Sequence, residues 1–297
     1  MPLLTGSGIQ KLSGPQVFSI SPRRTALTWA LGLLLLVTGS TAAAETVSAD
    51  CPPRVPGGRL VLGRAPLTIV GEIHGTHEAP EAVFALACRA SHRVPVRIGL
   101  EIPTAEQQRV DQFLSDGDRE QLLAGPFWHR SLQDGRSSEA MLELLDQVRR
   151  LRGRGIDIDV FVFDRPPREG RTRDAEMAER IGEALEDEPQ AKFLILVGNV
   201  HARTVEGVPW NPTYVPMGAF LDARFPLTSL NLSYRGGTAW VCIGDPPDCG
   251  VHQVSPHPDQ GDDPHVVLYQ QRDEAGYDGE LYVVELTAAP PAIGEPN

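Results

Sequence analysis

The feature of this sequence that most restricts its fold is the alternation of short apolar runs with amphipathic segments. Four runs rich in large apolar residues are each followed by a segment whose apolar residues recur at helical spacing. The run at 192–197 is almost continuously apolar, which is typical of a central strand covered on both faces. The alternation predicts an α/β fold with a mainly parallel central sheet and helices on both faces. The expected strands lie at 67–70, 96–100, 156–163 and 192–197, and the expected helices at 80–89, 104–114, 137–151 and 172–185.

After Phe225 the pattern changes to short strands separated by turns. A Gly-, Pro- and Asp-rich stretch at 244–264 predicts a long loop between two of them. We expect antiparallel additions to the same sheet at 227–232, 239–243, 266–269 and 281–286.

These elements are expected to form one domain over residues 67–288. A Pro- and Gly-rich N-terminal arm at 45–66 precedes the domain, and a Pro-rich loose tail at 289–297 follows it.

The first 44 residues have the three parts of a secretory signal. Arg23 and Arg24 precede an apolar run at 30–37, and small residues follow at 42–44. The run is too short to span a membrane, so we expect a cleavable signal peptide at 1–44 and no stable membrane anchor afterwards. The protein is therefore expected to be periplasmic or secreted, and the paired arginines leave both the Sec and the Tat route open.

The net charge narrows the range of partners. The whole chain carries a formal charge of −12, and removal of a segment with three basic and no acidic residues makes the mature chain more acidic. Because such a chain offers no basic stripe to phosphates, we expect no nucleic-acid partner.

All four cysteines lie beyond the expected signal peptide. An even number of cysteines in an oxidising compartment predicts disulfides. Cys242 and Cys249 flank a turn-rich segment and can close a small loop, and Cys51 would then pair with Cys88. Three pairings are formally possible, and this one is preferred. No CxxC motif supports a thiolate metal site.

Ionisable residues follow each of the first four expected strands. The carboxyl ends of parallel strands share one sheet edge, where open α/β sheets bind ligands. Two strand ends have the form Gly-x-x-His, at 71–74 and 198–201. The other two strands end in Glu101 and in Asp164 followed by Arg165.

Two histidines and one carboxylate from separate strands make a three-ligand open site of the kind that catalytic divalent metals use. We predict His74, His201 and either Glu101 or Glu72 as ligands of Mn, Co or Zn. The other glutamate is the candidate general base. Arg173 is a candidate for stabilising negative charge that develops on the substrate. Further candidates for substrate binding are Arg130, Arg136, Asp164 and Arg165.

Structural explanations stay open beside these roles. Glu101 could be the ion-pair partner of a nearby arginine, and Asp164 and Arg165 could form a local pair in a rigid turn. His77 is expected to be solvated or to cap a helix. Solvated side chains in the acidic loop are expected for His252, His257 and His265.

Four motifs, in this order, resemble those of the superfamily that contains Tiki and TraB proteins, ChaN-like haem-binding proteins and erythromycin esterases. The motifs lie at 71–76, at 100–103 with Gln107 or Gln108 after it, at 173–178 and at 198–201, and the resemblance covers roughly residues 67–286. It implies an α/β fold in which the two Gly-x-x-His motifs and the strand-end glutamate form one site.

The branches of this superfamily imply different chemistry. Tiki-like members resemble metal-dependent peptidases, which supports His74 and His201 as ligands. Esterase-like members use Glu and His to activate water on a lactone, with an arginine assisting, and need no metal. Here a single residue separates Glu72 from His74, and Gly198 stands where esterases commonly carry a further His, which favours the Tiki/ChaN-like side. ChaN-like members imply haem or iron handling, although Cys51 is not preceded by a lipobox.

The leading hypothesis is an exported hydrolase that acts on a peptide, ester or amide bond of a small-molecule or peptide substrate. Water would be bound to a metal or activated by Glu and His at the site of the two Gly-x-x-His motifs. The alternative is a haem- or iron-binding uptake protein that uses the same histidines without catalysis. A secreted structural or interaction module is the third hypothesis.

Overall fold

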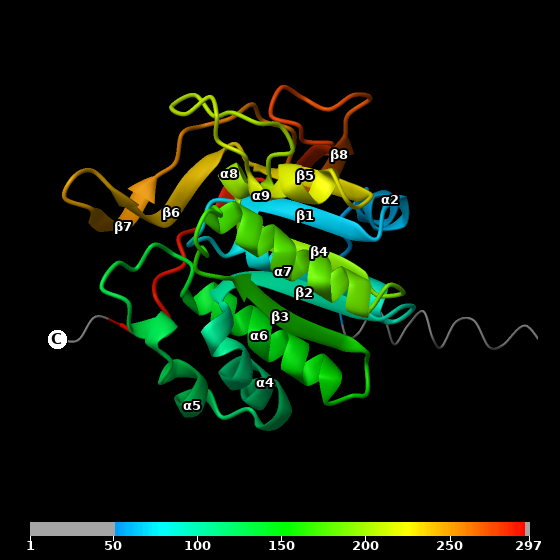
Figure 1. Ribbon diagram of the computed structural model, residues 1–297, viewed down its shortest axis with the longest axis vertical. Coiled ribbons are helices and arrows are strands. Elements are labelled where there is room, and N and C mark those ends of the chain that lie inside the picture. Colours follow the sequence, from blue (N-terminus) through cyan, green and yellow to red (C-terminus); the bar gives the residue numbers. More distant parts are fainter. Residues whose placement is uncertain (1–50, 295–297) are drawn as a thin grey trace, which may run out of the picture. The chain divides into compact units, whose positions relative to one another are not determined.

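A computed structural model describes residues 51–294, so the expected signal peptide at 1–44 lies outside the described residues. The described part is built on a seven-stranded sheet with the order β3-β2-β4-β1-β5-β9-β8 (Figure 1). Its strands are β1 (Leu67–Glu72), β2 (Val96–Pro103), β3 (Ile158–Asp164), β4 (Lys192–Gly198), β5 (Leu227–Ser233), β8 (His265–Leu268) and β9 (Gly279–Tyr282).

Every neighbouring pair in this sheet is parallel except β8 and β9. The expected α/β fold with a mainly parallel sheet is therefore confirmed. The central position of β4, between β1 and β2, also agrees with its continuous apolar run.

Two hydrophobic cores explain that run, one on each face of the sheet. Leu194 and Leu196 of β4 pack into the core under the helices at 78–91, 107–116 and 139–152, whereas Phe193 and Ile195 pack into the core under the helices at 173–187 and 217–222. Alternate residues of one strand thus supply both cores. The helices are α2 (Gly58–Arg64), α3 (Glu78–Ser91), α4 (Gln107–Asp116), α5 (Arg119–Leu123), α6 (Glu139–Arg152), α7 (Arg173–Asp187), α8 (Asn199–Ala202) and α9 (Met217–Asp222), with 3₁₀ turns at Thr104–Glu106 and Pro126–His129.

Side-chain caps mark the start of three of these helices, α5, α6 and α7. Ser138 Oγ accepts from the backbone N–H of Met141 at the start of α6, and Thr172 Oγ1 accepts from the N–H of Ala175 at the start of α7. Because α7 begins after Thr172, its first residue, Arg173, reaches Asp164 at the end of β3, which is the carboxyl edge of the sheet.

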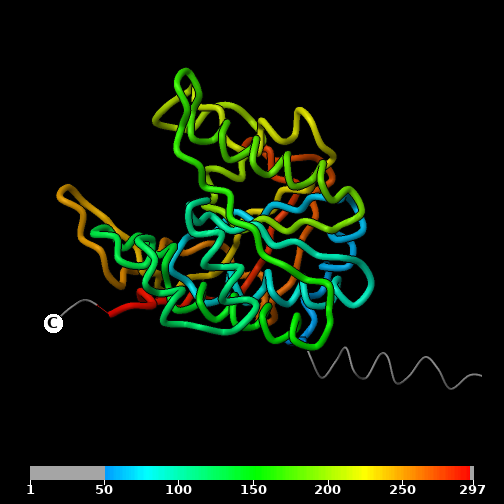
Figure 2. The backbone as a smooth tube through the Cα atoms, turned by 60° about the horizontal axis from the view of Figure 1, so that its bottom comes forward, coloured from blue at the N-terminus to red at the C-terminus, as the bar shows by residue number. Residues whose placement is uncertain are grey.

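The chain after Phe225 departs from the expectation. β5 and β9 are parallel members of the main sheet, and β8 alone is antiparallel. A second, three-stranded sheet contains β6 (Gly236–Ile243), β7 (Asp248–Gln253) and β10 (Glu285–Leu286). The expected loop at 244–264 therefore contains strand β7. Three of its six residues are exposed and none is buried, so no apolar alternation marks it in the sequence. The β6–β7 hairpin projects from the body in both backbone views (Figure 2).

Both ends of the expected domain are more ordered than their composition indicates. Within the expected arm, helix α2 buries Val61. Beyond residue 288, Ala289 is fully buried and donates its N–H to the Gly75 carbonyl, and Ala292 donates to the Ser137 carbonyl. The first residues of the expected loose tail are thus packed against the domain, because backbone hydrogen bonds hold a segment that has no apolar pattern of its own.

The preferred disulfide pairing is confirmed. Cys51 bonds to Cys88 and ties the described N-terminus to α3, and Cys242 bonds to Cys249 across the β6–β7 hairpin. Two disulfides are typical of proteins that fold in an oxidising environment. Among the residues that the structure describes, no helix has the length and apolar character needed to cross a membrane.

Candidate active site

The carboxyl edge of the main sheet brings most of the predicted site residues together. Glu72 ends β1 and His74 follows it, Glu101 lies near the end of β2, Asp164 ends β3, and His201 lies in α8 directly after β4. Parallel pairing of these four strands carries their ends to one side. The first turn of α7 adds Arg173 and Asp174 to this group, as the contacts below show.

Glu101 lies at the centre of the site and is 4% exposed. Its Oε1 accepts from Arg173 Nη2 at 2.7 Å and from Arg136 Nη1 at 3.3 Å. Its Oε2 accepts from the backbone N–H of Gly198 at 2.9 Å and lies 3.3 Å from His74 Nε2. Burial alone would raise the pKa of Glu101, but His74 and the neighbouring cations outweigh burial and hold that pKa well below its usual range. Glu101 is therefore an ionised group whose two oxygens are both occupied.

His74 lies between two carboxylates. Its Nδ1 is 3.0 Å from Glu72 Oε1, and its Nε2 faces Glu101. Burial lowers the pKa of His74, but the carboxylates of Glu101 and Glu72 outweigh burial and raise it to about 10. Burial likewise raises the pKa of Glu72, against the opposing effect of His74. His74 is thus an imidazolium that donates from both ring nitrogens.

His201 has a different environment. Its Nδ1 lies 2.7 Å from Asp174 Oδ1, and its Nε2 lies 3.2 Å from Arg173 Nη1. Because a guanidinium has donors and no acceptor, Nε2 must be the acceptor. This assigns the ring proton to Nδ1, where it is donated to Asp174. In this arrangement Nδ1 of His201 donates to Asp174, and Nε2 accepts from Arg173.

Asp174 is a buried carboxylate that three groups hold. Besides His201, its Oδ1 accepts from the Met217 N–H at 2.8 Å, and its Oδ2 accepts from Tyr214 Oη at 2.9 Å. Tyr214 Oη also lies 3.0 Å from His201 Nδ1. Neither Asp174 nor Tyr214 is among the site residues predicted from the sequence. Asp174 lies inside the motif at 173–178, so that motif could have indicated it, whereas nothing in the pattern around Tyr214 does.

Of the four predicted arginines, two lie in the site, one reaches it indirectly and one lies outside it. Arg136 and Arg173 both contact Asp164, with Arg136 Nη1 3.0 Å from Oδ2 and Arg173 Nε 2.8 Å from Oδ1. Arg130 reaches this group only indirectly, since it pairs with Asp134, which also pairs with Arg136.

Arg165 does not join the site, contrary to the expectation for substrate binding. Its guanidinium pairs with Glu183 of α7. Arg165 directly follows Asp164, and the side chain that comes after a strand-end residue turns to the opposite side of the chain. His77 occupies the N-cap position of α3, but its side chain pairs with Glu139 and makes no cap hydrogen bond.

Gly198 provides the space in which the two histidines approach each other. A Cβ added there would lie 3.0 Å from His74 Nε2 and 3.6 Å from both Glu101 Oε2 and His201 Cδ2. Glu101 of β2, His74 after β1 and His201 of α8 therefore converge on a position that has no side chain.

The donor groups in this arrangement do not fit a divalent ion. Three of the four ring nitrogens of His74 and His201 face carboxylates, and the fourth faces a guanidinium. Both oxygens of Glu101 already accept from protein donors. The same pairing leaves neither histidine a free nitrogen for haem iron. Over residues 51–294, potential ligand atoms cluster closely enough for a metal at Cys51, Cys88 and His92, where the cysteines form a disulfide.

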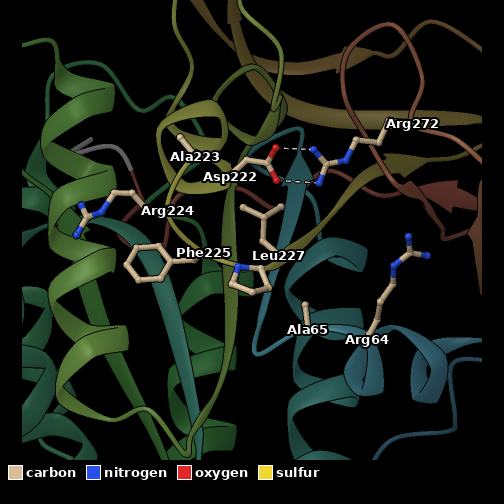
Figure 3. Close-up of a pocket in the computed structure, with 9 residues that line it drawn as sticks. Arg64, Ala65, Asp222, Ala223, Arg224, Phe225, Leu227 and Arg272 are labelled. Atoms are coloured by element: carbon tan, nitrogen blue, oxygen red, sulfur yellow. Dashed lines mark hydrogen bonds and ion pairs between the residues drawn. The ribbon is translucent and has the colours of Figure 1, made fainter.

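A cavity of about 440 Å³ lies elsewhere, where Ala65 precedes β1 and Leu227 begins β5. This is the amino edge of the parallel sheet, opposite the histidines. Arg272 in its wall pairs with Asp222 through two hydrogen bonds of 2.6 and 2.8 Å (Figure 3). Because this arginine is already paired and no histidine lines the cavity, we place the candidate active site at the carboxyl edge.

Comparison with known proteins identifies the fold. No protein-family model and no curated protein sequence matches the chain. Among solved structures, a variant of the erythromycin esterase EreC in its open conformation has 13% identity and a TM-score of 0.60, over 79% of this chain and 94% of that one. A succinoglycan biosynthesis protein has 9% identity and a TM-score of 0.52, over 85% of this chain and all of that one. A Bacillus cereus protein has 11% identity and a TM-score of 0.51, over 86% of this chain and all of that one. The described part of the chain therefore has the mixed α/β fold seen in erythromycin esterase.

Proposed function

We propose that this protein is a hydrolase that cleaves a carboxylic ester or amide bond with water activated by His201, without a metal. The fold of an esterase supports a hydrolase. The observation that carries the proposal is the contrast between the two histidines. One lies between two carboxylates, and the other is oriented by a single buried carboxylate and accepts through its outer nitrogen.

In this mechanism Asp174 holds the Nδ1 proton of His201, and Nε2 removes a proton from water as the water oxygen attacks the carbonyl carbon. Asp174 stabilises the imidazolium that forms. When the tetrahedral intermediate collapses, the carbon–oxygen or carbon–nitrogen bond to the leaving group breaks. The leaving group takes the proton from His201, so one water is consumed and the protein returns to its starting state.

Three cationic side chains lie where they can stabilise the negative charge of the tetrahedral intermediate. Arg173 lies beside His201 Nε2. Arg136 contacts the same two carboxylates as Arg173, those of Glu101 and Asp164. His74 contributes a further positive charge. Preorganised cations at the point where negative charge develops lower the barrier of acyl transfer. A substrate carbonyl that binds at Arg173 would also draw this arginine away from Nε2 and leave that nitrogen to the water.

This proposal changes the role expected for the glutamates. Glu101 is a poor base because its pKa is held low and both its oxygens are occupied. Glu72 is 3% exposed, and its carboxylate contacts Nδ1 of His74. We assign Glu101 to holding the arginines and Glu72 to keeping His74 protonated.

The test is hydrolysis of a panel of p-nitrophenyl esters, lactones and peptide amides by the wild-type protein and by His201→Asn. Removing a general base lowers kcat by about 100-fold or more. His77→Asn is the matched control, because His77 lies at the N-cap position of α3, where its ring pairs with Glu139 and its side chain makes no cap hydrogen bond. The control should keep wild-type rates. Full activity in His201→Asn would refute the proposal.

A further inference from the structure

The segment between α8 and α9 brings one side chain onto the proposed base. Tyr214 comes from this segment, residues 203–216, and its Oη lies 2.9 Å from Asp174 Oδ2 and 3.0 Å from His201 Nδ1. Asp174 and His201 belong to different elements, α7 and α8. Tyr214 therefore joins a third part of the chain to the carboxylate–histidine pair.

The backbone around Tyr214 is held in place. The Gly207 N–H donates to the Tyr214 carbonyl at 2.8 Å, and Val208 and Asn211 exchange backbone hydrogen bonds of 2.9 and 3.0 Å. These bonds close a turn whose base includes Tyr214. The hydroxyl is thus presented by an ordered backbone, which limits the positions it can take.

The hydroxyl also stays protonated. Burial, and then the charge of Asp174, raise the pKa of Tyr214 above its ordinary value. A tyrosine that keeps its proton is a permanent donor, so it binds the ionised form of Asp174 and restrains that carboxylate.

The two oxygens of Asp174 have separate tasks. Oδ1 accepts from His201 Nδ1 and from the Met217 N–H, whereas the bond to Oδ2 comes from Tyr214. Without the tyrosine hydroxyl, only Oδ1 would be held and the carboxylate could rotate about its Cβ–Cγ bond. The bond that fixes the ring proton of His201 on Nδ1 would then weaken.

We propose that Tyr214 is a positioning residue that fixes the Asp174 carboxylate and thereby keeps His201 in the tautomer with its proton on Nδ1. The inference rests on the proposed function, in which Nε2 of His201 takes the proton from water. It extends that function by assigning the segment at 203–216 to the organisation of the base.

The test compares Tyr214→Phe with the wild-type protein by two independent measurements. The first is ¹⁵N NMR of the His201 ring, which distinguishes the two tautomers without any substrate. We expect a single Nδ1–H form in the wild type and a mixture in Tyr214→Phe. Asp174→Asn, which removes the carboxylate itself, should shift the tautomer in the same direction. An unchanged tautomer in Asp174→Asn would also overturn the proposal, because the carboxylate through which Tyr214 acts would then not set the tautomer.

The second measurement is steady-state kinetics on an ester that the wild type hydrolyses. Loss of one positioning hydrogen bond should lower kcat about tenfold and leave KM within about twofold. Tyr269→Phe is the matched control. Tyr269 Oη donates to the Glu280 carboxylate at a distance of 2.6 Å, and Glu280 lies in β9 rather than in the candidate active site. The control should leave both the tautomer and kcat unchanged.

The outcomes separate the two proposals. A tautomer change in Tyr214→Phe supports the positioning role even if the wild type hydrolyses none of the esters, in which case only the proposed function fails. A single Nδ1–H tautomer in Tyr214→Phe would overturn the positioning role, whatever the kinetics show.

Discussion

Gly198 shows how closely single residues determine this site. Adding one methyl group there would place a carbon 3.0 Å from His74 Nε2, which is closer than most real contacts, so His74 must shift. We expect Gly198→Ala to lower kcat at least about tenfold, because the added methyl group displaces His74 from its position beside Glu101. Its thermal unfolding temperature should change little, since a side-chain shift of a few tenths of an ångström is sufficient.

The matched control is Gly63→Ala, at a helix position where an added Cβ meets nothing within 4 Å. Steady-state kinetics and thermal unfolding of both variants check the prediction. Unchanged kcat in Gly198→Ala would show that the reaction does not depend on this convergence.

His74 predicts how stability depends on pH. Its folded-state pKa is raised from 6.5 to about 10 by the two carboxylates, against the opposing effect of burial. The bound proton therefore stabilises the fold fully below pH 6.5, and this stabilisation is lost as pH rises from 6.5 to 10. One proton corresponds to a slope of at most about 1.4 kcal/mol per pH unit.

Urea unfolding at a series of pH values across this window measures the slope. His74→Gln should flatten it, because the group that releases the proton on unfolding is gone. If the wild-type protein and His74→Gln lose stability equally over this range, His74 is not a protonated histidine between the carboxylates.

The sequence indicates which residues gather at the site but not how they pair. Glu101, His74 and His201 can be placed at one edge because parallel strands carry their ends to the same side. The pairing depends on side-chain conformation, which the sequence does not show. The sequence therefore led us to expect a metal site, whereas in the structure these residues pair with one another and with arginines. Tyr214 could not be predicted, because it lies in an irregular segment without a periodic pattern.

At the scale of elements, the β6–β7 hairpin supports the loop that carries Arg136. Trp240 Nε1 donates to the Gln133 carbonyl at 2.9 Å, and the Trp240 N–H donates to the Gly75 carbonyl at 2.9 Å. The hairpin thus holds two segments beside the active site, one before Arg136 and one directly after His74.

Trp240→Phe should loosen the first of these segments, because it removes the side-chain donor and keeps an aromatic ring. We expect faster amide hydrogen exchange over residues 130–136 and unchanged exchange in β4. Trp210→Phe is the control, since Trp210 is 74% exposed. Equal exchange over 130–136 in Trp240→Phe and wild type would contradict a supporting role for the hairpin.

Elements with a buried face were predictable, and exposed ones were not. The four expected strands of the first part and their helices are present because apolar periodicity reports burial. Apolar periodicity does not indicate strand direction. We expected β5 and β9 to be antiparallel, whereas both are parallel members of the main sheet. β7 was missed because its exposed residues lack the alternation.

At the scale of the whole molecule, the two disulfides and the N-terminal signal pattern together support export. We propose that the mature chain begins at Glu45, after the small residues at 42–44. Protein recovered from the periplasm should have the mass of residues 45–297 with two disulfides, one of them between Cys51 and Cys88. Intact mass spectrometry before and after reduction measures both. An uncleaved chain or free thiols in the periplasmic protein would contradict export by this route.

The central claim is that His201, oriented by Asp174, activates water without a metal. The most direct test is the rate of ester hydrolysis by wild-type protein that has been dialysed against a chelator and shown by elemental analysis to be metal-free. We predict that this protein keeps its full kcat and that added Mn, Co or Zn does not increase it, whereas His201→Asn remains inactive under the same conditions. Loss of activity on metal removal, followed by recovery when one of these ions is returned, would contradict the account.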